Sequence, residues 1–212
     1  MYILKFDLDD KSYHVAGGTK AKPFKTTEAA RYKQLTKALQ RATWMKNDGA
    51  KFAAMQRRTQ FLSNLQSKIW LSRDIMKSTM SKGERTLIFC GSIEQSVELC
   101  GENVYNSDTN ADKLTAFCDK AISYLGVCQA LNEGKNIPEV DQSIIVQGTS
   151  KELTLFQRIG RNVRWRENHM AKIILLVAKG TADEKWARSA TFNIDKKRIK
   201  EFYVKPETVG NS

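Results

Sequence analysis

Short apolar runs separated by polar segments of helical length organise the second half of the chain. Five such runs predict β-strands, over residues 86–90, 103–105, 124–130, 143–146 and 172–178. Helices are expected between them, with Ser92 and Ser150 as N-caps, and a last helix from Asp183 to Thr191. Continuous apolar strands that alternate with helices are typical of a parallel sheet covered on both faces, so we predict an α/β fold.

The first 80 residues follow a different pattern. Apolar and polar residues alternate loosely from Tyr2 to Val15 around a turn-like Asp9-Asp10-Lys11, which predicts a β-hairpin or edge ribbon. A long helix is expected from Thr27-Glu28, with a break at residues 47–49. A second helix would then carry a stripe of apolar core residues: Leu62, Leu65, Ile69 and Met76. We therefore expect a ribbon and a helical arm over residues 1–80, and the main domain over residues 81–212.

The charge of the chain is concentrated in the helical arm. The formal net charge is +12, and residues 20–85 hold 16 basic residues against four acidic ones, which accounts for the whole excess. A basic arm on an electrically balanced domain suggests a nucleic-acid partner, and Arg57 and Arg58 are candidate contacts. On charge alone, a solubilising helix face explains the excess equally well.

Composition excludes several classes of protein. Hydrophobic residues make up 41% and charged residues 27% of the chain, which favours a globular core. The four cysteines form no Cys-x-x-Cys pair and only two histidines occur, so we expect reduced, mostly buried thiols and no metal site held by cysteine or histidine. No signal-like or membrane-spanning segment is found, and a cytoplasmic location without membrane contact is expected.

One segment combines arginines and glycine in a pattern suited to phosphate. Residues 157–164 read Gln-Arg-Ile-Gly-Arg-Asn-Val-Arg, so Arg158, Arg161 and Arg164 recur every third residue. On a helix this spacing leaves them on neighbouring positions of one face. A planar guanidinium matches phosphate oxygens, and such a row can reach a triphosphate held by another domain, as arginine fingers do. Taken in isolation, the row also fits a solvated basic face.

Three segments together resemble the second RecA-like domain of superfamily 2 helicases, in the DEAD/DEAH or restriction-enzyme-III-like group and its phage-type members. Residues 86–92 resemble motif IV, residues 130–138 resemble motif V, and residues 157–164 match the motif VI pattern Gln-Arg-x-Gly-Arg-x-x-Arg at every defined position. The order and spacing fit over roughly residues 82–190. The resemblance implies a RecA-like, P-loop-NTPase-like parallel sheet.

The resemblance also implies roles for individual residues. Arg161 and Arg164 would act as fingers at the γ-phosphate of ATP, while Gln157 and Arg158 would contact the phosphates and the interface between domains. Gly134 and Asn136 would couple the nucleotide to the bound strand, and Gly91 and Ser92 would contact phosphates of that strand. The motif V segment differs from that of many relatives: it lacks their usual Thr and Asp residues and has Asn136.

Two motifs of the family are missing from the sequence. It contains no Gly-x-x-x-x-Gly-Lys-Ser/Thr loop and no Asp-Glu-x-His/Asp box. ATP and Mg²⁺ would therefore be bound mainly by a first RecA-like domain, supplied in cis or in trans. We expect the chain to be the C-terminal half of a helicase or translocase that acts on nucleic acid, with DNA preferred, and to be inactive alone. The alternative is a non-catalytic nucleic-acid-binding module; a doubly wound small-molecule enzyme fits poorly, since no Gly-x-Gly-x-x-Gly turn occurs.

Overall fold

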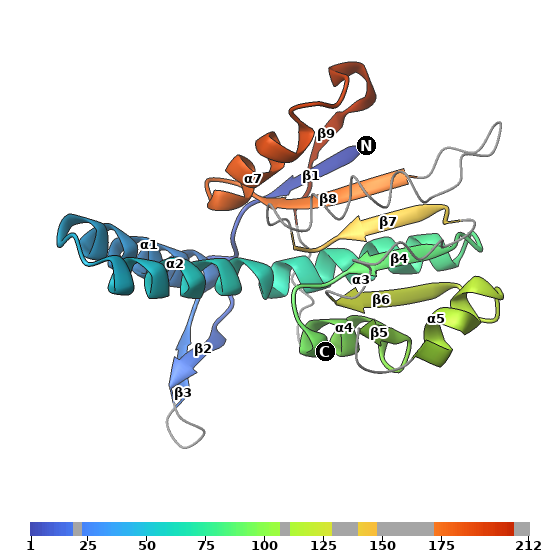
Figure 1. Ribbon diagram of the computed structural model, residues 1–212, viewed down its shortest axis with the longest axis horizontal. Helices are drawn as coiled ribbons and strands as arrows, with labels where there is room; N and C mark the ends of the chain where they lie inside the picture. Colours follow the sequence, from blue (N-terminus) through green and yellow to red (C-terminus); the bar gives the residue numbers. More distant parts are fainter. Residues whose placement is uncertain (19–22, 107–110, 129–139, 148–171, 206–212) are drawn as a thin grey trace.

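A seven-stranded parallel β-sheet forms the centre of the structure. The computed structural model describes residues 1–18, 23–106, 111–128, 140–147 and 172–205. In sheet order the strands are β5 (Val104–Asn106), β6 (Tyr124–Cys128), β4 (Thr86–Phe89), β7 (Gln142–Ile145), β8 (Lys172–Ala178), β1 (Tyr2–Phe6) and β9 (Lys200–Tyr203) (Figure 1). All of the pairings are parallel, as the strand–helix alternation predicted.

Helices cover both faces of this sheet. One face packs against α3 (Gln66–Met80) and α4 (Ile93–Cys100), and the other against α5 (Ala111–Cys118) and α7 (Ala182–Thr191). Within β4, Leu87 and Phe89 enter the core under α5 and α7, whereas Ile88 faces the core under α3 and α4. This division follows from the period of two along a strand, and it explains why the strands are apolar at every position.

The N-terminal strand does not form the hairpin that its sequence predicts. β1 lies inside the sheet and pairs in parallel with β8 and β9, and Ile3 and Phe6 are buried on its opposite faces. A ribbon does exist, but it joins β2 (His14–Gly18) to β3 (Pro23–Thr26). The prediction was wrong because loose alternation cannot reveal that a strand is covered on both faces, and covering both faces buries more apolar surface.

The helical arm is an α-hairpin that projects from the sheet (Figure 1). Its helices are α1 (Glu28–Trp44), which starts where predicted and is capped by Thr27, and α2 (Asp48–Ser63), which is capped by Asn47 at the predicted break. A second break was not predicted: the chain leaves helical geometry at Leu65, and α3 starts at the next residue. The stripe from Leu62 to Met76 therefore spans two helices.

The third helix belongs to the core of the sheet. Ile69 and Met76 of α3 pack in the same buried cluster as Ile88 and Leu176 of the central strands. The division of the chain at residue 81 stays a prediction, but strand β1 and helix α3 on its N-terminal side share this core. After α7, a short 3-10 helix η1 (Lys196–Arg198) leads into β9. Within the described ranges, no helix is both long and apolar enough to cross a bilayer.

The cysteine prediction is confirmed. None of the four cysteines, all of which are described, forms a disulfide; Cys90, Cys100 and Cys128 are buried, and Cys118 is half-buried. Burial raises the pKa of the Cys90 thiol well above its usual value and that of Cys100 to about 12. These thiols behave as small apolar side chains and are poor nucleophiles at neutral pH.

Candidate functional site

The carboxyl ends of the parallel strands define the edge at which a ligand is expected. In open α/β sheets, loops at this edge form the binding site, because all strands deliver their following loops to the same side. Strand β4 ends next to Gly91, β6 at Cys128, β7 next to Gln147 and β8 at Ala178. The α1–α2 arm and the β2–β3 ribbon project from this same edge (Figure 1).

Ser92 caps the helix that follows β4, as its sequence position predicted. Its hydroxyl oxygen accepts the backbone N–H of Gln95 at 3.1 Å and so satisfies one open donor in the first turn of α4. The pKa of the neighbouring Glu94 is lowered, because its carboxylate accepts its own backbone N–H and a hydrogen bond from Ser92. The first turn of α4 presents the partial positive charge of a helix N-terminus at the carboxyl edge, with the N–H groups of Glu94 and Gln95 already bound within the turn.

Gly91 lies at a contact between two strand ends and the arm. Its N–H donates to Gln95 Oε1 at 2.8 Å, and Gln95 Nε2 donates to the carbonyl oxygen of Ser63, the last residue of α2, at 2.6 Å. A Cβ at position 91 would lie 2.0 Å from Gln147 Oε1 and 3.0 Å from Ser63 Cβ. Glycine leaves this space to Gln147 and Ser63, which would have to shift to accommodate a Cβ.

Two glutamines at this edge were not singled out from the sequence. Gln95 is 3% exposed and joins α4 to α2, while Gln147 Oε1 is buried and receives no hydrogen bond within the described part of the chain. A signal for Gln95 was present, because Ser92-Ile93-Glu94-Gln95 matches the Ser-x-x-Gln capping box. For Gln147, which follows a strand, no local pattern could have indicated its place.

The two arginines predicted on the arm differ in their surroundings. Arg57 is exposed and lines a pocket of about 610 Å³ between the β2–β3 ribbon and the base of the arm, whereas Arg58 is half-buried and does not line it. The pocket includes Asn64 and Leu65 at the α2–α3 junction. Since Ser63 contacts the Gly91 loop, the pocket and the β4 loop meet at the same junction.

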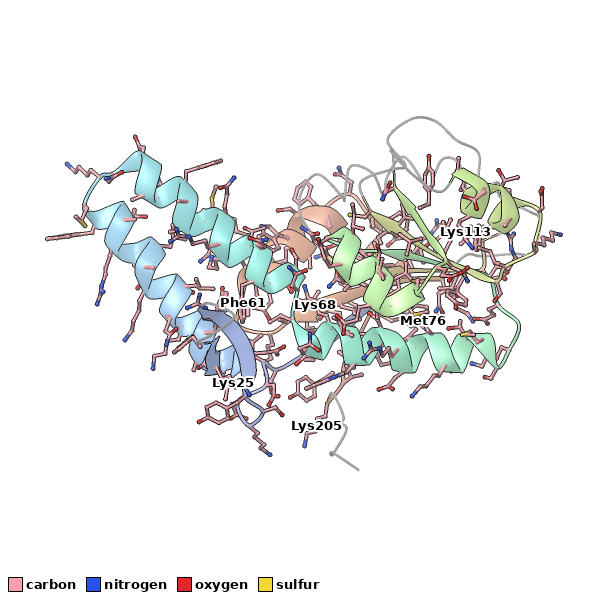
Figure 2. All side chains as sticks on the ribbon, turned by 90° about the horizontal axis from the view of Figure 1, so that it is seen from below. Lys25, Phe61, Lys68, Met76, Lys113 and Lys205 are labelled. Atoms are coloured by element: carbon pink, nitrogen blue, oxygen red, sulfur yellow. The ribbon has the colours of Figure 1, made fainter. Side chains whose placement is uncertain are left out.

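Lys68 is one of the 16 basic residues that the sequence places in residues 20–85, but it lies in the interior and adds nothing to the exposed charge of the arm. Its ammonium lies 2.8 Å from Asp183 Oδ2, and both side chains are at most 3% exposed (Figure 2). The same carboxylate oxygen accepts the backbone N–H of Ala178 at 3.1 Å. The ion pair joins α3 to the first turn of α7, where a negative charge is favoured by the helix dipole.

A second buried carboxylate binds the same first turn of α3. The N-cap position of α3 is Leu65, which has no side-chain acceptor. Glu28 of α1 replaces it: Oε1 accepts the backbone N–H of Ser67 at 3.0 Å, and Oε2 accepts its hydroxyl at 2.6 Å and the N–H of Asp9 at 3.2 Å. One side chain thus fixes the relative position of the arm, the end of β1 and the α2–α3 junction.

The remaining predicted residues lie outside the described residues. These are Gly134 and Asn136 in the segment after β6, and Gln157, Arg158, Arg161 and Arg164 in the segment after β7. Their neighbours in the chain that are described, Cys128 and Gln147, are at the carboxyl edge of the sheet. In the described ranges, no three His, Cys, Asp or Glu side chains gather in a way that could hold a metal ion.

Comparison with known proteins was made by sequence and by structure. No protein-family model and no curated protein matches the sequence. Among solved structures, the C-terminal domain of a Sulfolobus solfataricus SWI2/SNF2 ATPase is similar, with a TM-score of 0.58 at 15% identity over 78% of this chain and 80% of that one. The core of a Sulfolobus solfataricus SWI2/SNF2 ATPase in complex with dsDNA gives a TM-score of 0.59 at 14% identity, over 78% and 41%.

A bacterial structure extends the comparison. The E. coli DEAD-box protein SrmB, bound to regulator of ribonuclease activity A, gives a TM-score of 0.52 at 18% identity, over 69% of this chain and 91% of that one. The chain thus spans about two fifths of the archaeal ATPase core that it matches. At these identities the likeness concerns the fold, and the chain has the RecA-like fold seen in the C-terminal domains of superfamily 2 helicases.

Proposed function

We propose that this chain, which has the RecA-like fold of helicase C-terminal domains, is the second motor domain of an ATP-dependent nucleic-acid helicase or translocase. One observation carries the proposal: strands β6 and β7 end at the same edge of the sheet, and the two segments with helicase-like residues follow these strands in sequence. Residues 130–138 and 157–164 would then serve one site, built between this domain and a P-loop domain.

In this proposal the arginines complete a nucleotide site that the other domain provides. Arg161 and Arg164 would donate hydrogen bonds to the γ-phosphate and stabilise the charge that develops during phosphoryl transfer. Gln157 and Arg158 would contact the phosphates and the opposing domain. The P-loop domain would hold ATP and Mg²⁺, since the described residues form no carboxylate cluster that fits a metal.

The bound strand would contact the end of β4 and the arm. The half-exposed hydroxyl of Ser92 and the partial positive charge at the N-terminus of α4 would contact phosphate groups without reading the sequence of bases, and Gly91, whose N–H already donates to Gln95, would set the course of this loop. Gly134 and Asn136 would transmit the state of the nucleotide to this strand. We propose DNA as the substrate, because the archaeal ATPase core of similar fold was solved with double-stranded DNA.

A non-catalytic nucleic-acid-binding module is the second candidate. It is favoured by the absence of a Gly-x-x-x-x-Gly-Lys-Ser/Thr phosphate loop from the 212 residues. In that case the arginines would bind only backbone phosphates, and affinity would fall steeply with salt.

Nucleic-acid-stimulated ATP hydrolysis separates the two candidates. The assay uses the 212-residue chain and the longest natural reading frame that contains it, each with single-stranded DNA, duplex DNA and RNA. We expect turnover only in the longer protein, or when a separate P-loop subunit is added. Absence of turnover in all combinations would favour the binding module, and turnover by the chain alone would contradict the proposed division of the site.

A further inference from the structure

The pocket between the ribbon and the arm has a composition that the proposed domain contacts do not explain. It encloses about 610 Å³, within the range of roughly 300–1,000 Å³ that is usual for small-ligand pockets. Its lining includes three cations from three elements: Lys25 of β3, Arg31 of α1 and Arg57 of α2. Within the described residues, none of the three forms an ion pair. Arg31 donates to Gln34 Oε1 at 3.2 Å and lies 5.8 Å from the centre of the Phe24 ring, but neither contact neutralises its charge.

Glu28, the one acidic residue that lines the pocket, already accepts hydrogen bonds from other parts of the chain. Both carboxylate oxygens of Glu28 accept hydrogen bonds from Ser67, and one of them also accepts the N–H of Asp9. Glu28 is 4% exposed and forms part of the pocket floor, where it does not compete with a ligand for the cations above it. The lining therefore keeps a net positive charge, which favours phosphate.

Aromatic and amide side chains accompany these cations. Tyr13 is 72% exposed at the rim and Phe61 is half-buried in the wall, so both offer apolar ring surface. Gln60 and Asn64 add amide donors and acceptors. Figure 2 shows Lys25 and Phe61 at the base of the arm, on the ribbon and on α2 respectively. Exposed rings beside unpaired cations are the arrangement that binds single strands, through stacked bases and neutralised phosphates.

We infer that this pocket binds one segment of a single-stranded nucleic acid, with a base on Tyr13 and the backbone phosphates at Arg31 and Arg57. Asn64 and Leu65 line the pocket and their neighbour Ser63 contacts the Gly91 loop, so the pocket and this loop adjoin the same α2–α3 junction. The inference rests on the proposed nucleic-acid function and adds a binding site that lies outside the motor motifs.

The test measures binding of fluorescent oligonucleotides to the full chain over a range of salt concentrations. The double variant Arg31→Gln with Arg57→Gln should bind single-stranded DNA more weakly. The slope of log K against log salt should become less steep by about 1.4, because each phosphate contact contributes about 0.7 for single strands. The matched control removes two charges elsewhere on α1, by Lys33→Gln with Arg41→Gln, and should keep the slope of the unchanged protein.

The aromatic contact is tested separately with Tyr13→Ser. Stacking of one base on an aromatic ring contributes about 1–3 kcal/mol, so affinity should fall about 5- to 150-fold. An oligonucleotide with abasic sites should bind the unchanged protein more weakly than a normal one, and Tyr13→Ser should remove this difference. Because Tyr13 is largely exposed, this variant is expected to fold, and thermal melting checks both sets of variants.

The outcomes distinguish the pocket from the proposed function. Equal weakening in the pocket and control variants would show a general effect of arm charge and overturn the inference, as would Tyr13→Ser binding with unchanged affinity. If the unchanged chain binds nucleic acid and the pocket variants bind equally well, only the pocket is refuted. If the unchanged chain binds no nucleic acid at all, the proposed function fails together with the pocket.

Discussion

Gly91 shows how a single residue sets the geometry of the candidate site. Its missing side chain leaves room for Gln147 Oε1 and for Ser63, which come from the end of β7 and the end of α2. The hydrogen bond from its N–H to Gln95 holds the loop in this position. A methyl group here would separate the two strand ends from the arm.

We expect Gly91→Ala to lower the free energy of unfolding by about 1–3 kcal/mol, measured by urea denaturation. Gly49→Ala is the matched control, since a Cβ there would meet only Asn47 Oδ1 at an ordinary 3.6 Å, and should be neutral or slightly stabilising. Gln147→Ala removes the side-chain atoms nearest to the new methyl group, so the double variant Gly91→Ala with Gln147→Ala should recover part of the lost stability. An equal loss in the double variant would exclude contact with Gln147 as the cause.

The buried thiols give a prediction about pH. Burial raises the pKa of Cys90, and raises that of Cys100 to about 12, so the folded state keeps the neutral thiols. Their contribution to stability is complete below the unfolded thiol pKa of about 8.5, and it is lost as pH rises through the folded values. Stability to urea should therefore decrease above about pH 9.

Alkylation of the native protein at pH 8, followed by mass spectrometry, tests the same burial. Only Cys118, which is half-buried, should react readily, and all four thiols should react after unfolding. Stoichiometric labelling of Cys90 or Cys100 in the native protein would contradict the packing of α4 and β4 described above.

At the scale of elements, two buried carboxylates hold the first turn of α3. Glu28 of α1 accepts hydrogen bonds from Ser67, and Asp183 of α7 pairs with Lys68, the next residue. Glu28 therefore joins α3 to the arm, and Asp183 joins it to α7. Movement of the arm away from α3 would have to break the Glu28 contacts.

Removing one partner of the Lys68–Asp183 pair should be costly. Lys68→Met leaves a buried carboxylate without its cation, and we expect a loss of about 3–5 kcal/mol in unfolding free energy. Adding Asp183→Asn removes that charge while an amide oxygen still accepts the N–H of Ala178, so part of the loss should be recovered. If the double variant is less stable than Lys68→Met, the charge of Asp183 is not what the lysine compensates.

Lys172→Met is the control for this prediction. Lys172 lies 2.7 Å from Glu84, but its side chain is 43% exposed. This contact raises the pKa of Lys172, although solvent screens it. We expect a change of at most about 1 kcal/mol.

At the scale of the whole molecule, the prediction concerns the proposed nucleotide site, which this chain would complete together with a P-loop domain. In the intact, ATP-hydrolysing protein, Arg161→Ala or Arg164→Ala should lower turnover by about 10³-fold or more, by analogy with the loss of an arginine finger. Arg198→Ala, in the exposed η1 segment, should leave turnover unchanged. Near-normal turnover in both finger variants would contradict the proposed role of residues 157–164.

Local patterns in the sequence were sufficient for much of the architecture. The strands β4, β6, β7 and β8, the helix start at Thr27-Glu28, the break at residues 47–49 and the cap at Ser92 depend on neighbours within a few residues, so they could be predicted. The parallel sheet followed from apolar strands alternating with helices. The candidate residues Gly91, Ser92 and Arg57 stay predictions, the first two from the helicase resemblance and Arg57 from the charge of the arm.

Only the tertiary structure decided which distant residues meet. In the structure, β1 lies inside the sheet, the predicted second helix is divided at Leu65, and Lys68 is a buried partner of Asp183. The sequence by itself determined the hydrophobic period of each segment and the capping of its helices, because both depend on residues that are close in the chain. The partner of a strand edge or of a charge depends on the residue that folding brings opposite to it, and no local pattern contains that information.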